Sequence, residues 1–131
     1  MVEFEVDEGG LVKYMALIYG DASRWEAFSD TEREAVYDRY RAFGDEGRAA
    51  GVVQGGAELG PTRDATTVRV RDDETLVTDG PYAEVKEALG GYYLLECSSM
   101  DEALDWAARI PGAEHGAVEV RPLYVDEGAE S

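Results

Sequence analysis

The sequence predicts an α+β fold, a ferredoxin-like antiparallel sheet with two helices on one face. Short segments of alternating or continuous apolar residues are typical of strands, and two other segments combine helical spacing with Ser-x-x-Glu capping boxes. Their order is strand, helix, several strands, helix, strand, which supplies two helices for one sheet. A chain of 131 residues with 44% hydrophobic content has room for one domain with one core.

The first half of this pattern is a strand followed by a long helix. The strand is predicted over residues 12–19 (VKYMALIY), where both faces are apolar after Lys13, and such a strand is covered on both sides. The helix is predicted over residues 30–50, because Ser29 and Glu32 form a capping box and Gly51 follows the last helical position.

The second half contains the remaining strands and the second helix. Strands are predicted over 52–59, 65–71 and 75–78, and a doubly apolar strand over 91–97. In the segment 65–71, one parity carries Thr66, Val68 and Val70, and the other carries Thr67, Arg69 and Arg71. A second capping box at Ser99 opens a helix that stops before Pro111, and the last strand is predicted over 117–123.

The apolar strands predict a homodimer. Two helices cover only one face of a sheet, yet segments 12–19 and 91–97 are apolar on both faces. The uncovered face must therefore meet another surface, and a second copy of the same sheet is the economical solution. The single domain is predicted over residues 11–125, with acidic, glycine-bearing tails at 1–10 and 126–131 that we expect to be flexible.

The charge and cysteine content restrict the partners. A net charge of −17, from 29 acidic and 12 basic residues, repels phosphate backbones and anionic lipid, so no nucleic-acid or membrane partner is expected. Cys97 is the sole cysteine and the sequence has no zinc-ligand spacing, which predicts neither a disulfide nor a metal or cofactor site. With no apolar run of membrane-spanning length and an acidic N-terminus, the pattern indicates a soluble cytoplasmic protein.

Residues 78–91, TDGPYAEVKEALGG, interrupt the strand pattern and contain the main site candidate. In one interpretation, Asp79 is a general base or ligand anchor held by a tight turn, and Lys86 pairs with it or with a ligand anion. In the other, Asp79 caps the turn, Pro81 fixes φ and Lys86 is solvated. Both interpretations stay open, and we expect the Asp79 side chain to be mostly buried and hydrogen-bonded within its own loop, beside a small cleft.

Other residues are candidates for the walls of such a pocket. Tyr14 and Tyr82 would supply aromatic walls, although strand aromatics belong to cores more often than to pockets. Arg121 would bind an anionic ligand group in a polar cavity between subunits, or the charged residues of the strands would pair with one another. His115 precedes Gly116 in a loop, where it is more typical of a connecting residue than of a ligand or base.

The stretch DGPYAEVKEALGGYYLLE, followed by DEALDWAARIP and GAVEVRPL, resembles the YCII-related family in its DGPF-domain branch. The matching signature positions are Asp79, Gly80, Pro81, Tyr82, Ala83, Glu84, Lys86 and Glu87, with Tyr82 in place of the usual phenylalanine. The resemblance implies a dimeric α/β-barrel fold and little about chemistry. It also implies a histidine and aspartate pair whose histidine lies in the first helix. Residues 30–50 contain no histidine, so that pair does not transfer by position.

Two classes of function follow. The first is a small-molecule-binding protein or enzyme with Asp79 in a pocket at the sheet and dimer interface. The second is a non-catalytic interaction protein, because DGPF-domain relatives are associated with extracytoplasmic-function sigma factors. A dioxygen-using monooxygenase, as in other dimeric α/β barrels, has no diagnostic residues in this sequence.

Overall fold

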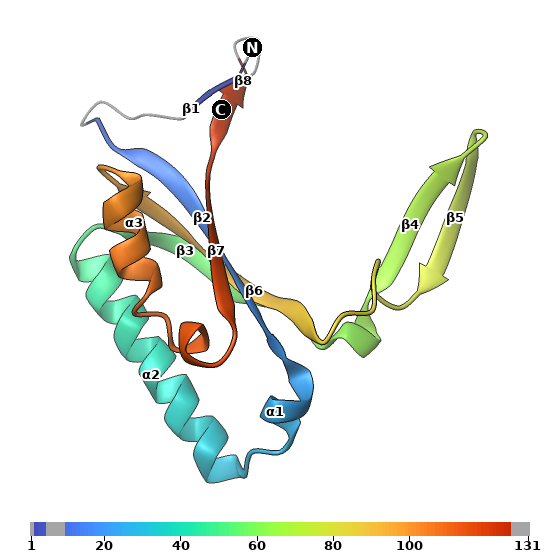
Figure 1. Ribbon diagram of the computed structural model, residues 1–131, viewed down its shortest axis with the longest axis horizontal. Helices are drawn as coiled ribbons and strands as arrows, with labels where there is room; N and C mark the ends of the chain where they lie inside the picture. The colour runs from blue at the N-terminus through green and yellow to red at the C-terminus, as the bar shows by residue number, and fades with distance from the viewer. Residues whose placement is uncertain (1, 5–9, 127–131) are drawn as a thin grey trace.

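The computed structural model describes residues 2–4 and 10–126, and its centre is a four-stranded antiparallel sheet (Figure 1). The strand order is β3-β6-β2-β7, so the first and third strands of the unit lie in the middle, as in ferredoxin-like folds. The strands are β2 (Val12–Asp21), β3 (Val53–Glu58), β6 (Glu87–Cys97) and β7 (Ala117–Pro122). The α+β architecture expected from the sequence is confirmed.

Two helices, α2 (Asp30–Ala49) and α3 (Met100–Ala107), pack on one face of this sheet (Figure 1). Each begins at its sequence-predicted cap. The hydroxyl of Ser29 accepts the backbone N–H of Glu32, whose carboxylate accepts the N–H of Ser29. In α3 the hydroxyl of Ser99 accepts the N–H of Glu102, whose carboxylate accepts instead from Ser98. A short helix α1 (Ala22–Glu26) and two 3₁₀ turns, η1 (Thr62–Asp64) and η2 (Pro111–Glu114), complete the helical segments among the described residues.

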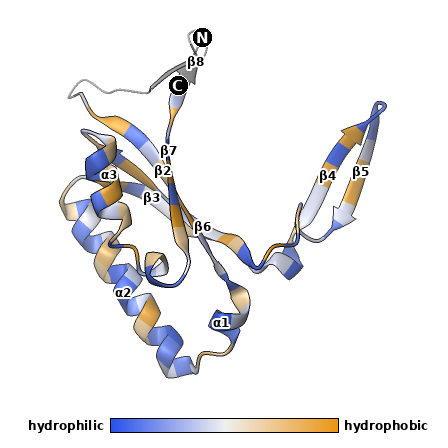
Figure 2. Cartoon of the chain, in the orientation of Figure 1, coloured by the Kyte–Doolittle hydropathy of each residue, from blue (hydrophilic) through white to orange (hydrophobic). Residues whose placement is uncertain are grey.

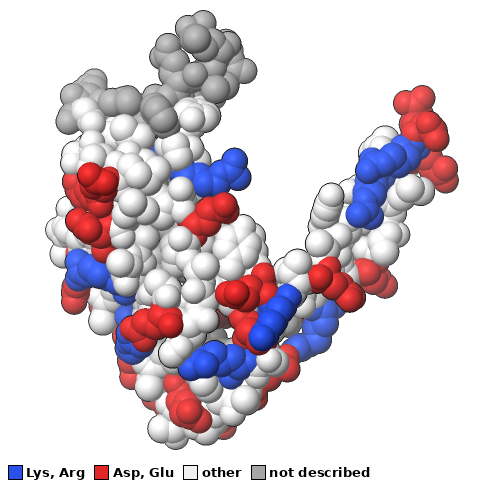
Figure 3. Space-filling model, in the orientation of Figure 1, with Lys and Arg blue, Asp and Glu red and all other residues white. Residues whose placement is uncertain are grey.

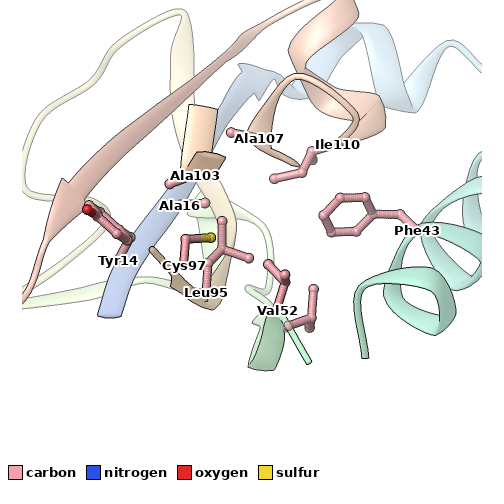
Figure 4. Packing of buried hydrophobic residues seen from close by; sticks show 10 residues of the cluster. Tyr14, Ala16, Phe43, Val52, Leu95, Cys97, Ala103, Ala107 and Ile110 are labelled. Carbon is pink, nitrogen blue, oxygen red and sulfur yellow. The ribbon is translucent and has the colours of Figure 1, made fainter. Parts of the chain in front are cut away.

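The hydrophobic core lies between the sheet and these helices (Figure 4). Leu95, Cys97 and Ile110 have their side chains fully buried there. The helix α2 approaches β3 closely at Gly47, because a Cβ at that position would collide with the side chain of Val53. The remaining core residues are Tyr14, Ala16, Phe43, Val52, Val53, Ala103 and Ala107.

The strands β4 (Thr66–Arg71) and β5 (Glu74–Asp79) form a separate two-stranded hairpin, which we call the arm (residues 66–79). The arm projects from the body on the side away from α2 and α3 (Figure 1). Asp72 and Asp73 turn the chain at its tip with φ of 51° and 64°, as a type I′ hairpin turn requires. The sequence locates both strands within one residue but does not indicate that they leave the main sheet.

The described ends of the chain meet in a small sheet. Here β1 (Val2–Phe4) pairs antiparallel with β8 (Tyr124–Asp126), so part of each expected tail is in a strand. Residues 1, 5–9 and 127–131 of the expected tails lie outside the described residues. Within residues 2–4 and 10–126, no helix has both the length and the apolar composition needed to cross a membrane.

Candidate functional site

The signature loop (residues 80–86) joins the arm to β6, and its first residues form a tight turn. Gly80 has φ of 105°, a conformation that glycine adopts without strain. Its N–H donates to the carbonyl of Ala65 over 2.7 Å, and its own carbonyl accepts the hydroxyl of Thr67 over 2.8 Å. These two hydrogen bonds close the base of the arm, so the Asp-Gly-Pro segment acts as a turn in this structure.

Asp79 is the last residue of β5, opposite Thr66, and its side chain is exposed. The expectation that this side chain is mostly buried is therefore wrong. The physical reason is the arm itself, because all six residues of β5 are exposed and no second layer covers them. Within the described part of the chain, the Asp79 carboxylate forms neither a hydrogen bond nor an ion pair, and its catalytic role stays a prediction.

Lys86 and Tyr82 also lie on the surface of the signature loop. Hydrogen bonds from the hydroxyl and backbone N–H of Ser23 lower the pKa of Asp21, and the nearby charge of Lys86 lowers it further. The positive charge of Lys86 therefore stabilises the Asp21 carboxylate at the end of β2, which pairs with the start of β6. The ring of Tyr82 is 73% exposed and lies under the guanidinium of Arg69, at 5.1 Å from ring centroid to Cζ.

Tyr14 and Arg121 lie on opposite faces of the sheet. The side chain of Tyr14 is 5% exposed within the core, and burial raises its pKa, with Cys97 and Glu102 adding to the shift. Arg121 pairs in register with Met15, the strand neighbour of Tyr14, and therefore points to the face away from the helices. Within one chain, the structure does not gather the predicted site residues into one pocket.

A cleft of about 320 Å³, the loop cleft, does lie beside the signature loop. One wall comes from the loop, another from η1, and Ala88 of β6 contributes as well. The lining residues are Thr62, Arg63, Gly80, Pro81, Ala83, Glu84, Val85 and Ala88. None of the five site residues predicted from the sequence lines this cleft. The only sequence signal for its second wall is the turn at Gly60-Pro61, which places η1 next to the arm.

The loop cleft combines apolar and charged groups. Pro81, Ala83 and Val85 supply apolar surface, and Arg63 and Glu84 supply one charge of each sign. The Nη1 of Arg63 contacts a carboxylate oxygen of Glu26 over 3.4 Å, and both side chains are largely exposed. Because an exposed ion pair contributes little to stability, this guanidinium can turn towards a ligand at small cost.

The sheet has a second unassigned surface, the open face, on the side away from α2 and α3. Its apolar centre is formed by Met15, Leu17, Tyr92 and Leu94, which pair across β2 and β6 and lie outside the core cluster. Lys13 and Glu96 lie at one end, and Glu119 and Arg121 lie along β7. The hydroxyl of Tyr19 donates to Glu119 over 3.3 Å. No helix of the described chain covers this face (Figure 1).

His115 and Cys97, the residues most often used for metal or nucleophilic chemistry, lie elsewhere. Cys97 is buried in the core, and burial raises the pKa of its thiol to about 11, with Glu102 and Glu96 contributing. His115 is exposed at the end of η2, beside the Glu114 carboxylate that binds Arg39. Among the residues that the structure describes, no group of three or more His, Cys, Asp or Glu side chains could hold a metal ion.

The family match covers nearly the whole of this arrangement. The family model for the YCII-related domain matches residues 12–125, which include the full sheet, both long helices, the arm and the signature loop. The chain is also 44% identical over 119 residues to an uncharacterised protein of Rhizobium meliloti (strain 1021), covering 89% of this chain and 96% of the relative. The chain therefore belongs to the YCII-related domain family.

Proposed function

We propose that this YCII-related protein binds a small organic molecule in the loop cleft beside Asp79, and that its working unit is a homodimer. One observation carries the binding proposal: the signature loop that marks the family also forms a wall of a cleft of about 320 Å³. This volume lies within the roughly 300–1,000 Å³ of typical small-molecule sites.

The chemistry of the lining indicates the class of ligand. A molecule with an apolar body would contact Pro81, Ala83 and Val85, and a carboxylate or phosphate on it would accept hydrogen bonds from Arg63. Glu84 would disfavour a second anionic group or bind a cationic one. The proposed ligand is therefore a small amphipathic molecule with one acidic group, which Arg63 would attract locally against the net charge of −17 on the whole chain.

Two observations support the homodimer. The open face exposes part of a contiguous apolar surface, with Met15 and Leu17 of β2 beside Tyr92 and Leu94 of β6. The chain also exposes 8960 Å², whereas a compact monomer of 14.3 kDa is expected to expose roughly 6,800 Å². Part of this excess of about 2,000 Å² lies on the projecting arm, where all six residues of β5 are exposed.

A fragment screen on ¹⁵N-labelled protein tests the binding site. Aromatic and aliphatic carboxylates should shift the amide resonances of residues 62–63 and 82–88, which line or flank the cleft. Ala83→Trp should abolish these shifts, because an exposed alanine on the cleft wall would be replaced by a side chain that fills the space.

The matched control is Ala42→Trp. Ala42 is an exposed alanine in a different surface groove of about 240 Å³, lined also by Arg39 and Arg109. This variant should leave the fragment shifts at residues 82–88 unchanged. Shifts confined to the Ala42 groove, or the absence of any hit from the carboxylate set, would contradict the proposed site.

A further inference from the structure

The two faces of the arm differ in composition. Directly paired residues of an antiparallel hairpin lie on the same face, so Val68 faces the same side as Val77, and Val70 the same side as Thr75. We call this side the valine face; its residues are Thr66, Val68, Val70, Thr75, Val77 and Asp79. Only Asp79, at the base, carries a charge, although 31% of all residues in the chain are charged.

The valine face is exposed in a single chain. Val68, Val70 and Val77 are 58–64% exposed, and Figure 2 shows the hydrophobic bands of β4 and β5 on the projecting arm. The opposite face is different, because Arg69 lies over Tyr82 and the hydroxyl of Thr67 bonds the signature loop. Those contacts orient the arm and leave the valines without cover. A two-stranded hairpin with an unburied apolar face is at best marginally stable in water.

The open face offers an apolar surface with small residues along one edge. At its β3 edge, Gly55 pairs with Leu94 and Ala57 pairs with Tyr92, so two small residues lie beside two large ones. A Cβ built on Gly55 would meet no atom within 4 Å, which leaves room for another chain to approach the backbone. Because the β3 residues are smaller than their β6 partners, we take this apolar edge as the trough and the valine face as the ridge that would fill it.

We infer that the arm is exchanged between two copies of the chain, with the valine face of each arm seated on the open face of the other copy. This inference rests on the homodimer of the proposed function. A second copy is the favoured occupant because one chain carries both the ridge and the trough, and a two-fold axis uses each of them twice and leaves neither exposed. The exposure of the arm supports the same occupant, since all six residues of β5 and the valines of β4 are exposed in a single chain.

The distribution of charged residues on the arm and on the open face is consistent with this arrangement. The acids of the arm tip, Asp72, Asp73 and Glu74, gather at its end (Figure 3), and none of them belongs to the valine face. The open face keeps its charged residues at the rim, so the apolar centres can meet without burying them. Asp79 then enters the interface at the base of the arm, which makes its carboxylate part of a site that one chain does not complete.

Photocrosslinking tests the exchange in the full-length protein. Placing p-benzoylphenylalanine at Val70 or at Thr75, both exposed on the valine face, should give covalent dimers on irradiation. In mixed ¹⁴N and ¹⁵N protein, mass spectrometry should locate the crosslinks between chains, in peptides from residues 12–19 or 91–97. The same probe at Leu76, on the opposite face, should crosslink within one chain to residues 80–86.

The outcomes separate the two proposals. Suppose that the unmodified protein sediments as a dimer, but both valine-face probes either fail to crosslink or crosslink to the partner's arm or helices. The exchange is then overturned, and the homodimer survives. If the unmodified protein is a monomer and no chains are joined, the homodimer and the exchange both fail. Crosslinks from either valine-face probe into the central strands of the second chain support the exchange.

Discussion

The body and the arm of this protein are built from similar strands and differ in what covers them. In the body, β2 buries Tyr14 and Ala16 under two helices, and β6 buries Leu95 and Cys97. In the arm, β4 alternates just as regularly, yet Val68 and Val70 remain exposed. Alternation therefore predicts a strand and its two faces, but whether a face is buried depends on what lies over it.

This difference has a thermodynamic consequence. Burying a large aliphatic side chain stabilises a fold by about 1.5–3 kcal/mol, and the arm gains little of this in a single chain. The fold of the body is therefore expected to be stable alone, and the arm to depend on association. The predictions below test that contrast, beginning with the largest effect.

A matched pair of truncations should separate the two regions. Leu95→Ala removes a fully buried side chain from the core and should lower the free energy of unfolding by about 2–5 kcal/mol. Val77→Ala removes an aliphatic side chain that is 64% exposed and should change the unfolding of the monomer by less than about 0.5 kcal/mol. Urea denaturation at low protein concentration measures both. Equal losses in the two variants would mean that the arm packs on its own body.

Two buried glycines of α2 should respond in opposite directions to alanine. Gly47→Ala should cost about 1–3 kcal/mol, because the new methyl group collides with Val53 in the neighbouring strand. At Gly44 the nearest atoms to the methyl group belong to the flexible guanidinium of Arg48, which can move aside, so Gly44→Ala should stabilise the helix by about 1 kcal/mol. Thermal melts compare them directly, and a stabilised Gly47→Ala protein would show that helix and sheet are less closely packed than the structure indicates.

The core thiol should make the body sensitive to alkali. Burial raises the pKa of Cys97 from 9.0 to about 11, so the folded state keeps its proton where the unfolded state releases it. The stability from the neutral thiol is present below pH 9 and is lost between about pH 9 and 11. The stability difference between the natural protein and Cys97→Ala should shrink over this interval in urea titrations. If the stability difference between the two proteins did not change with pH, the pKa of the Cys97 thiol would not be raised in the folded state.

The smallest effect is expected at the tip of the arm. Asp73 has φ of 64°, so Asp73→Gly relieves a strained backbone and should stabilise the hairpin by up to about 1 kcal/mol. Amide hydrogen exchange of residues 66–79 should slow while that of β6 stays constant. Asp72→Ala, which keeps a Cβ at φ of 51° and removes the side-chain polar group, should have the opposite effect.

The sequence predicts the body of the fold well because its signals are local. Ser-x-x-Glu sequences at Ser29 and Ser99 mark the starts of both long helices, and doubly apolar segments mark the central strands. The projection of the arm was not predictable, since the same alternation fits a hairpin inside the main sheet or outside it. The short helix α1 has no capping box and was missed.

The site is predicted less well than the fold, again for physical reasons. The signature loop lies beside a cleft, but the site residues chosen from it are Asp79, Tyr82 and Lys86, whereas the lining comes from other positions of the same loop, among them Gly80 and Ala83. Arg63 reaches the cleft from a separate turn, and no local pattern links residue 63 to residue 84. Tyr14 is buried because its side of β2 faces the helices. Both faces of β2 are apolar, so the sequence does not show which of them the helices cover.

Sedimentation velocity on the natural protein, Val77→Glu and Thr78→Glu measures directly whether the exposed valine face belongs in an interface with a second copy. At micromolar concentration the natural protein should sediment at twice 14.3 kDa. Val77→Glu places a charge on the valine face and should sediment as a folded monomer, whereas Thr78→Glu adds the same charge to the opposite face and should remain dimeric. A monomeric natural protein, or a Val77→Glu variant that dimerises as tightly as the natural protein, would contradict the account.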